Sequence, residues 1–245
     1  MLDMGFSDDI LQIEKHLPKD RQTILFSATM PQKIQQLART ILNNPVEVKL
    51  AVSKPADKIQ QSAYVCYEAQ KLPLIKHLFK TQRPERVIIF TGSKIKTKDL
   101  AVSLSRAGFN VCAMHSDLAQ SERDEAMYAF RAGKVDVLVA TDIVARGIDI
   151  DDIQLGINYD VPHDEEDYVH RIGRTARANN DGCAITFVSE KEQTRFKAIE
   201  DFLEKTIYKI PVPEALGEAP EYNPKSASDG KRKFHDKGNR NHGKG

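Results

Sequence analysis

Long apolar segments are missing from this sequence of 245 residues. None of its apolar runs approaches the roughly 18 to 20 residues that a helix needs to cross a bilayer. The first residues, Met1 to Met4, lack the basic and apolar regions of a signal peptide. We therefore expect a cytosolic protein without a membrane partner.

Cysteine is also scarce. The three cysteines, Cys66, Cys112 and Cys183, are odd in number, lie far apart and stand in apolar stretches. This pattern is typical of reduced thiols that serve as small core side chains, and it argues against a metal or redox site.

The net charge of +1 is unevenly distributed along the chain. Residues 225–245 contain seven Lys or Arg and two Asp or Glu, a local charge of +5, which leaves −4 for residues 1–224. This terminal stretch has too few apolar residues to offset the entropy of ordering, so we expect residues 213–245 to form a disordered basic tail. The tail could be a solvated terminus or an electrostatic grip on a polyanion.

Apolar runs of five to seven residues, rich in Val and Ile, alternate with amphipathic stretches of ten or more residues. The alternation predicts an α/β fold in which helices cover both faces of a parallel sheet and ligands bind at the carboxyl ends of the strands. Strands are predicted at residues 23–26, 59–67, 86–91, 110–114, 135–140, 153–159 and 183–188. Helices are predicted at residues 7–17, 32–42, 72–80, 94–107, 120–131 and 190–203, with one more leading to His170.

Residues 51–57 have no periodicity and contain Pro55, as a linker would. Only one predicted strand and two predicted helices precede it, too few for a domain. We therefore expect residues 1–50 to be the end of a first domain that begins upstream. Residues 58–212 contain enough elements for a complete α/β domain.

The most informative cluster is Arg171, Arg174 and Arg177, preceded by His170. On a helix or helical turn, a spacing of three residues advances each side chain by about 300°, so the three guanidinium groups stay within an arc of roughly 120°. Three positive charges so close together repel one another, and a multiply charged anion between them would offset that repulsion. Spacing alone equally allows a solvated run of surface charge.

A second segment, Thr141 to Ile150, directly follows a predicted strand. Thr141 and Asp142 could cap the next turn and direct backbone N–H groups at a phosphate. Gly147 would allow close backbone approach, and Asp149 could accept hydrogen bonds from a ribose hydroxyl. Ordinary capping after a strand is the alternative.

Together the two segments resemble motifs V and VI of the DEAD-box RNA helicases of superfamily 2. Other segments resemble further motifs of that family in the family's order: Ser27-Ala28-Thr29 motif III, Val87 to Thr91 motif IV, Gln120 to Arg123 the Gln-x-x-Arg motif, and Met1 to Phe6 the stretch that follows the Asp-Glu-Ala-Asp box. The resemblance covers residues 1–212 and implies a RecA-like C-terminal domain of a bacterial member, preceded by the last strand and helices of a first RecA-like domain.

The resemblance also implies roles on the nucleotide side. Arg174 and Arg177 would be arginine fingers that reach the γ-phosphate of ATP, Asp149 would meet the ATP ribose, and Gly147 would belong to the same ATP site. His170 and Arg171 would connect motif VI to neighbouring motifs, and His170 would face Ser27 and Thr29 across a domain cleft.

On the RNA side, the residues implied to hold the sugar-phosphate backbone are Thr91, Gly92, Gln120, Arg123, Thr141 and Gly147. Contacts to the backbone carry no base information, so RNA binding would be independent of sequence. Two positions depart from the family: Ala176 stands where Gly is usual, and Ser116 where many relatives have Gly.

The sequence lacks a Gly-x-x-x-x-Gly-Lys-Ser/Thr phosphate loop and an Asp-Glu-Ala-Asp box. Asp164-Glu165-Glu166-Asp167 matches the box by letters, but it opens a helix, where acidic residues favour the helix dipole. We therefore expect this acidic run to cap a helix. We expect the phosphate loop and the Mg²⁺ ligands to lie upstream of this sequence, and the chain alone to be inactive. A stand-alone RNA-binding module and a DNA helicase of the same superfamily are the alternatives.

Overall fold

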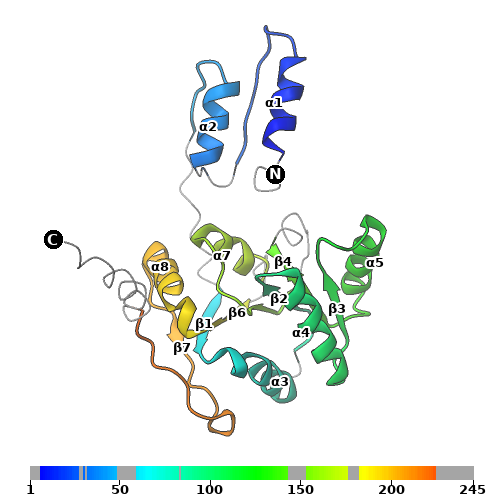
Figure 1. The fold of residues 1–245 in the computed structure, drawn as a ribbon, viewed down its shortest axis with the longest axis vertical. Coiled ribbons are helices and arrows are strands. Elements are labelled where there is room, and N and C mark those ends of the chain that lie inside the picture. Colours follow the sequence, from blue (N-terminus) through cyan, green and yellow to red (C-terminus); the bar gives the residue numbers. More distant parts are fainter. Residues whose placement is uncertain are drawn as a thin grey trace, which may run out of the picture. The chain divides into compact units, whose positions relative to one another are not determined.

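The computed structural model describes residues 6–27, 30, 32–48, 59–82, 84–142, 153–175 and 182–224. The chain divides into two compact units, Met1–Lys54 and Pro55–Gly245 (Figure 1). Within the described ranges, every helix is too short or too polar to cross a membrane.

The first unit contains two helices, α1 (Ser7–Lys15) and α2 (Gln32–Ile41). The strand predicted at residues 23–26 is wrong, because residues 21–27 have no regular secondary structure. Ile24 and Phe26 are 64% and 92% exposed. A strand requires a neighbouring strand for its backbone hydrogen bonds, and the described residues of this unit provide none.

The second unit is built on a seven-stranded sheet with the order β3-β4-β2-β5-β6-β1-β7. Every pairing in it is parallel, as the alternating pattern predicted. The strands are β1 (Gln60–Val65), β2 (Val87–Thr91), β3 (Val111–Met114), β4 (Val137–Thr141), β5 (Leu155–Asn158), β6 (Cys183–Val188) and β7 (Tyr208–Lys209). Only β7, a two-residue edge strand, was not predicted.

Helices connect the strands as expected of βαβ units (Figure 1). They are α3 (Lys71–Gln82), α4 (Lys94–Arg106), α5 (Gln120–Arg131), α7 (Glu165–Ile172) and α8 (Gln193–Leu203), with short 3₁₀ turns at Glu68–Gln70, Glu190–Glu192 and Glu214–Leu216. The α/β prediction is therefore confirmed for this unit.

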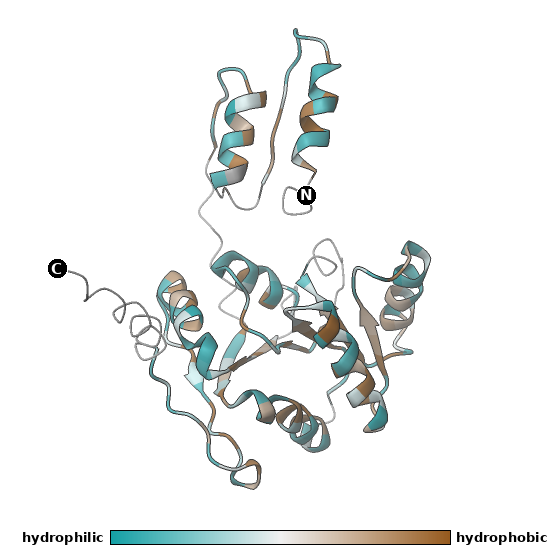
Figure 2. Cartoon of the chain, viewed as in Figure 1, coloured by the Kyte–Doolittle hydropathy of each residue, from teal (hydrophilic) through white to brown (hydrophobic). Residues whose placement is uncertain are grey.

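Alternate residues of each central strand face opposite sides of the sheet. In β2, Val87 and Ile89 pack into the cluster that contains α3 and α4, whereas Ile88 and Phe90 pack into the cluster that contains Phe130 of α5. A third cluster covers the side of the sheet under α7 and α8. Figure 2 shows hydrophobic strands in the middle of the sheet and helices that carry both hydrophobic and hydrophilic residues.

Within the second unit, residues 213–224 are bound by side chains of earlier elements. The side-chain amide of Gln70 donates to the carbonyl oxygens of Leu216 and Glu218 at 2.9 Å each, and the Tyr222 hydroxyl donates to Glu200 at 2.7 Å. The prediction of disorder is therefore wrong for residues 213–224, because buried polar side chains bind this backbone. The basic residues of the predicted tail, 225–245, lie outside the described residues.

Candidate functional site

The acidic run at the start of α7 is a helix cap, as predicted. The Asp164 carboxylate accepts a hydrogen bond from the backbone N–H of Asp167 at 2.7 Å, and Gly173 ends the helix. Three acidic residues fill the first turn, where they complement the helix dipole. These acidic residues therefore begin and stabilise α7, and their likeness to an Asp-Glu-Ala-Asp box is limited to the letters.

Arg171 is carried by α7 to the carboxyl edge of the sheet. Its guanidinium binds both oxygens of Asp142, with Nε to Oδ1 at 2.5 Å and Nη2 to Oδ2 at 2.7 Å. Nη1 donates to Asn158 Oδ1 at 3.2 Å and to the Asp160 carbonyl at 2.8 Å. The group also lies over the Phe90 ring, 5.3 Å from its centroid.

These contacts use most of the N–H donors of Arg171, and Asp142 balances its charge. The side chain is buried, so Arg171 is built into the fold and is not part of a solvated charge run. Its position is that of a residue that links α7 to the ends of β4 and β5.

The other members of the arginine cluster are placed differently. His170 is half-buried on α7, and Arg174 lies in the turn after the helix, where its N–H donates to the Arg171 carbonyl at 3.2 Å. Arg177 and Ala176 lie outside the described residues. Because α7 ends at Ile172, Arg171 lies on the helix and Arg174 lies in the turn that follows it.

At the end of β4, Thr141 is half-buried and Asp142 follows it. Both carboxylate oxygens of Asp142 bind Arg171, and the turn that Asp142 was predicted to cap lies outside the described residues. The next candidate residues, Gly147 and Asp149, lie outside the described residues. The segments that resemble motifs V and VI are therefore joined by the ion pair of Asp142 and Arg171.

At the end of β2, Thr91 is fully buried, and its hydroxyl lies 2.6 Å from that of Thr97. The hydroxyl of Thr91 therefore faces the interior, and its contact with RNA stays a prediction. Gly92 is exposed, and its N–H donates to Asp160 Oδ2 at 2.8 Å. The Ser93 hydroxyl then accepts from Lys96 N at 3.3 Å and begins α4.

Gln120 and Arg123 lie in the first turns of α5. Gln120 is exposed and donates to Asp124 at 2.9 Å, and Arg123 donates from Nη2 to the Ser116 carbonyl at 3.1 Å. Among the described residues, the buried side-chain atoms without a hydrogen-bond partner are Arg123 Nε and His115 Nδ1. Burial lowers the pKa of His115. Arg123 Nε is thus a buried donor without a partner among the described residues.

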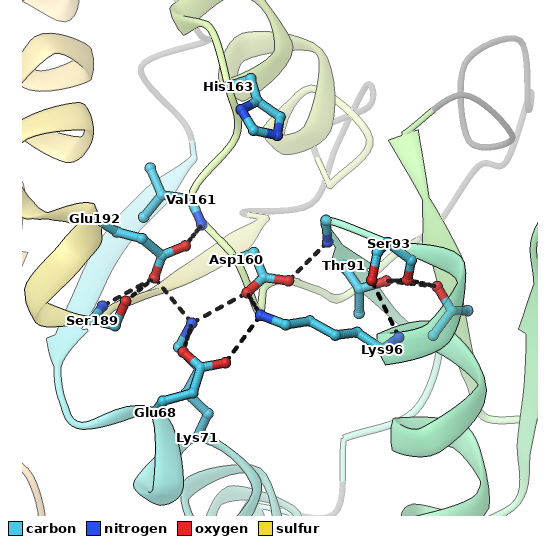
Figure 3. Close-up of polar contacts among 12 residues, drawn as sticks. Glu68, Lys71, Thr91, Ser93, Lys96, Asp160, Val161, His163, Ser189 and Glu192 are labelled. Carbon is cyan, nitrogen blue, oxygen red and sulfur yellow. Dashed lines mark hydrogen bonds and ion pairs between the residues drawn. The ribbon is translucent and has the colours of Figure 1, made fainter.

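An ion network centred on a buried lysine, which the sequence did not reveal, lies at the same edge of the sheet (Figure 3). The ammonium of Lys71, which is fully buried, lies 2.9 Å from Glu68, 3.0 Å from Glu192 and 3.3 Å from Asp160. Lys96 lies 2.6 Å from Asp160 and 3.0 Å from Glu68.

The network stabilises the charged forms of Lys71 and Asp160. Burial acts against the charge of Lys71, yet Glu192 and Asp160 raise its pKa above the ordinary lysine value. Burial likewise opposes ionisation of Asp160, but Lys71, Lys96 and the Gly92 N–H lower its pKa. Lys71 and Asp160 are therefore both ionised near neutral pH.

The three carboxylates of the network, Glu68, Asp160 and Glu192, are the described acidic residues close enough together to hold a metal ion. The Lys71 ammonium already lies within 3.3 Å of all three. Because the ammonium of Lys71 already lies against all three carboxylates, this group does not fit Mg²⁺.

One signal in the sequence could have indicated Asp160. It follows β5 almost directly, at the edge where ligand-binding residues gather in parallel sheets. No comparable signal marks Lys71, since a lysine in an amphipathic segment is usually exposed.

Comparison with known proteins places these features in a family. The model described as "Helicase conserved C-terminal domain" matches residues 70–179, and that described as "DEAD/DEAH box helicase" matches residues 1–37. The E. coli DEAD-box protein SrmB, solved in complex with RraA, is 36% identical, with a TM-score of 0.62, over 66% of this chain and 98% of that one. This chain belongs to the DEAD-box helicase family.

Other relatives agree with that assignment. The ATP-dependent RNA helicase CshA of Listeria monocytogenes is 40% identical to this DEAD-box chain over 214 residues, which are 87% of the chain and 41% of the relative. S. cerevisiae Dbp5 bound to RNA and ADP BeF3 matches with a TM-score of 0.76 at 34% identity, over 84% of this chain and 56% of that one. The DEAD-box chain thus spans less than half the length of CshA.

Proposed function

We propose that this chain is the RNA-gripping and nucleotide-sensing part of an ATP-dependent RNA helicase. The observation that carries the proposal is the convergence of the ends of β2 and β4 with α7 at one edge of the sheet, joined by Arg171 and Asp142. In open α/β sheets, this edge is where ligands bind.

RNA is proposed to lie along Gly92, Gln120, Arg123, Thr141 and Gly147. Gly92 and Gln120 are exposed, and the positive charge of Arg123 at the start of α5 suits a phosphate oxygen. Thr91 is proposed to support Gly92 from the interior. Contacts of this kind predict binding that is independent of base sequence and weakens as salt is added.

ATP is proposed to meet Arg174 and Arg177 at the γ-phosphate, and Asp149 with Gly147 at the ribose. Bound ATP supplies the phosphoanhydride bond, and the two arginines would stabilise the charge that develops on its phosphoryl oxygens. His170 is proposed to couple to Ser27 and Thr29 of the first unit. Arg171 is proposed to hold this segment in place.

We assign residues 1–50 to the end of a first RecA-like domain, 51–57 to a linker and 58–212 to a second RecA-like domain. The division between the two compact units, after Lys54, falls within the proposed linker. The chain has no phosphate loop and no acidic group that fits Mg²⁺ among its described residues, so ATP hydrolysis would require a domain that supplies both.

The test is to measure, by fluorescence anisotropy, how tightly the 245-residue chain binds fluorescently labelled single-stranded RNA and DNA. Two unrelated RNA sequences should bind within about threefold of each other, DNA of the same sequence should bind more weakly, and added salt should weaken RNA binding. Equal binding of DNA would favour the DNA-helicase alternative, and absence of RNA binding would overturn the proposal. RNA-stimulated ATP turnover by the chain alone would contradict its proposed inactivity.

A further inference from the structure

Two glycines of the second unit stand where no turn requires them. Gly156 lies inside β5, a central strand paired with β2 on one side and β6 on the other, and Gly182 directly precedes β6. The glycines with a positive φ among the described residues are Gly108, Gly133 and Gly217. A glycine inside a strand weakens it and often marks a place where another segment approaches closely. Space, and not backbone conformation, is therefore the reason for Gly156 and Gly182.

Thr175 occupies the space beside both glycines. Leu155 and Ile157 pack on the side of the sheet that α3 and α4 cover, so Gly156 faces the opposite side, where α7 lies. A methyl group added at Gly156 would lie 2.8 Å from Thr175 Cγ2, and one added at Gly182 would overlap the Thr175 carbonyl oxygen. Thr175 thus fits against the sheet because both positions lack a side chain.

Hydrogen bonds also fix Thr175. The residue is 3% exposed, its hydroxyl donates to the Ile172 carbonyl at 2.7 Å, and its N–H donates to the same oxygen at 2.9 Å. Hydroxyl and methyl group share one χ1 angle in a β-branched side chain, so the bond of the hydroxyl also sets the direction of the methyl group. The methyl group cannot yield to an added neighbour without loss of this bond.

Arg174 lies between two fixed residues. Before it, Arg171 is bound by Asp142, and the Arg171 carbonyl accepts from the Arg174 N–H at 3.2 Å. After it, Thr175 is packed against the two glycines. A group that stabilises developing charge is most effective when it is held in place before the reaction, within about 0.5 Å. The backbone of Arg174 meets this condition from both sides.

We propose that Gly156 and Gly182 form a seat for Thr175, and that Thr175 is thereby a positioning residue that sets Arg174 for the γ-phosphate. The inference rests on the proposed function of Arg174. Thr175 acts only through the backbone of the residue before it, and Arg174 alone would touch the nucleotide. Displacement of Thr175 should therefore lower turnover at saturating ATP and RNA and leave RNA affinity unchanged.

Gly156→Ala and Thr175→Ser test the seat because together they move one methyl group from residue 175 to residue 156. Both are made in a protein that joins this chain to a phosphate-loop domain. Gly156→Ala overpacks the seat and should lower RNA-stimulated turnover on the order of tenfold. Thr175→Ser leaves the seat underfilled and should lower turnover about threefold. The double variant conserves volume and should return to within about twofold of the unmodified protein.

Ile75→Val is the matched control for a loss of stability. Ile75 is fully buried on α3, on the other side of the sheet, and the substitution also changes the core by one methyl group. It should lower the midpoint of thermal unfolding and retain turnover. Equal losses of turnover in Ile75→Val and Gly156→Ala would overturn the inference. If Gly156→Ala alone does not fold, the double variant must still turn over ATP faster than Thr175→Ser.

A second measurement uses the 245-residue chain without nucleotide. In the NMR spectrum, Gly156→Ala should shift the backbone amide signal of Arg174, and the double variant should return it toward its original position. An Arg174 signal that ignores Gly156→Ala would contradict the seat. If Arg174→Ala leaves the turnover of the joined protein unchanged, the proposed function of Arg174 is wrong, and the NMR series still decides whether the seat fixes this turn.

Discussion

Arg171 grips Asp142 through two parallel hydrogen bonds, Nε to Oδ1 at 2.5 Å and Nη2 to Oδ2 at 2.7 Å. A two-point guanidinium–carboxylate pair fixes orientation as well as distance. It therefore ties the start of the arginine segment to the end of β4, where the segment proposed to meet RNA and ribose begins.

Arg171→Met should lower the free energy of unfolding by about 2 to 4 kcal/mol, because it leaves Asp142, Asn158 and the Asp160 carbonyl without their donor. The Arg171 and Asp142 side chains are only 3% and 20% exposed, so solvent screens the pair weakly. Urea unfolding of the chain measures the change. Lys197→Met, which removes an exposed ion pair with Asp201 on α8, is the control and should have little effect. Equal stability of both variants would show that the Arg171 pair is energetically neutral.

The buried network predicts a specific loss of stability in acid. The pKa values of Asp160 and Glu68 lie below their ordinary values in the folded chain because the lysines offset the cost of burial. The unfolded chain therefore binds protons at higher pH than the folded chain does. This stabilisation is present above about pH 4 and is lost as the pH falls through the lowered folded values.

Asp160→Asn should accordingly flatten the dependence of unfolding free energy on pH below about pH 4. The difference from the unmodified chain should persist in added salt, because buried pairs are screened less than exposed ones. Denaturant titrations over a pH series measure both effects. Parallel acid profiles for the two proteins would contradict the lowered pKa of Asp160.

The arginine fingers are tested in a protein that joins this chain to a phosphate-loop domain. Arg174→Ala or Arg177→Ala should lower RNA-stimulated ATP turnover by on the order of 10³-fold, since each removes positive charge from the proposed γ-phosphate site. RNA affinity without nucleotide should stay within about threefold. Arg106→Ala, at the exposed end of α4, should retain turnover. Turnover that survives both finger substitutions would refute their assignment.

Cys66 and Cys112 should react slowly with thiol reagents in the folded chain. Burial raises the pKa of Cys66 to about 12 and that of Cys112 to about 11, so neither forms an appreciable amount of thiolate at about pH 8. Iodoacetamide should leave Cys66 unmodified in the folded chain and should label all three cysteines in urea, as read by mass spectrometry. Rapid labelling of Cys66 without denaturant would indicate that its burial is transient.

Local pattern was sufficient for most of the fold. The Val- and Ile-rich runs became strands because both faces of a central parallel strand are buried, and Asp164 began α7 because its carboxylate caps the first turn. The strand predicted at residues 23–26 did not form, because burial and pairing depend on neighbouring elements. Its side chains are apolar, but pairing is a property of the neighbouring strand, which a local pattern does not contain.

The arrangement of the site is a different matter. Chain order alone determined that Thr141, His170 and Arg171 belong to neighbouring motifs at one edge of a parallel sheet, because that edge follows from strand direction. Only the tertiary structure decided that Thr91 faces inward, that Arg171 is neutralised by Asp142, and that Lys71 is a buried cation among three carboxylates. Side-chain partners 29 to 121 residues apart are brought together by the crossovers of the sheet, and electrostatic pairing depends on that distance in space and not on spacing along the chain.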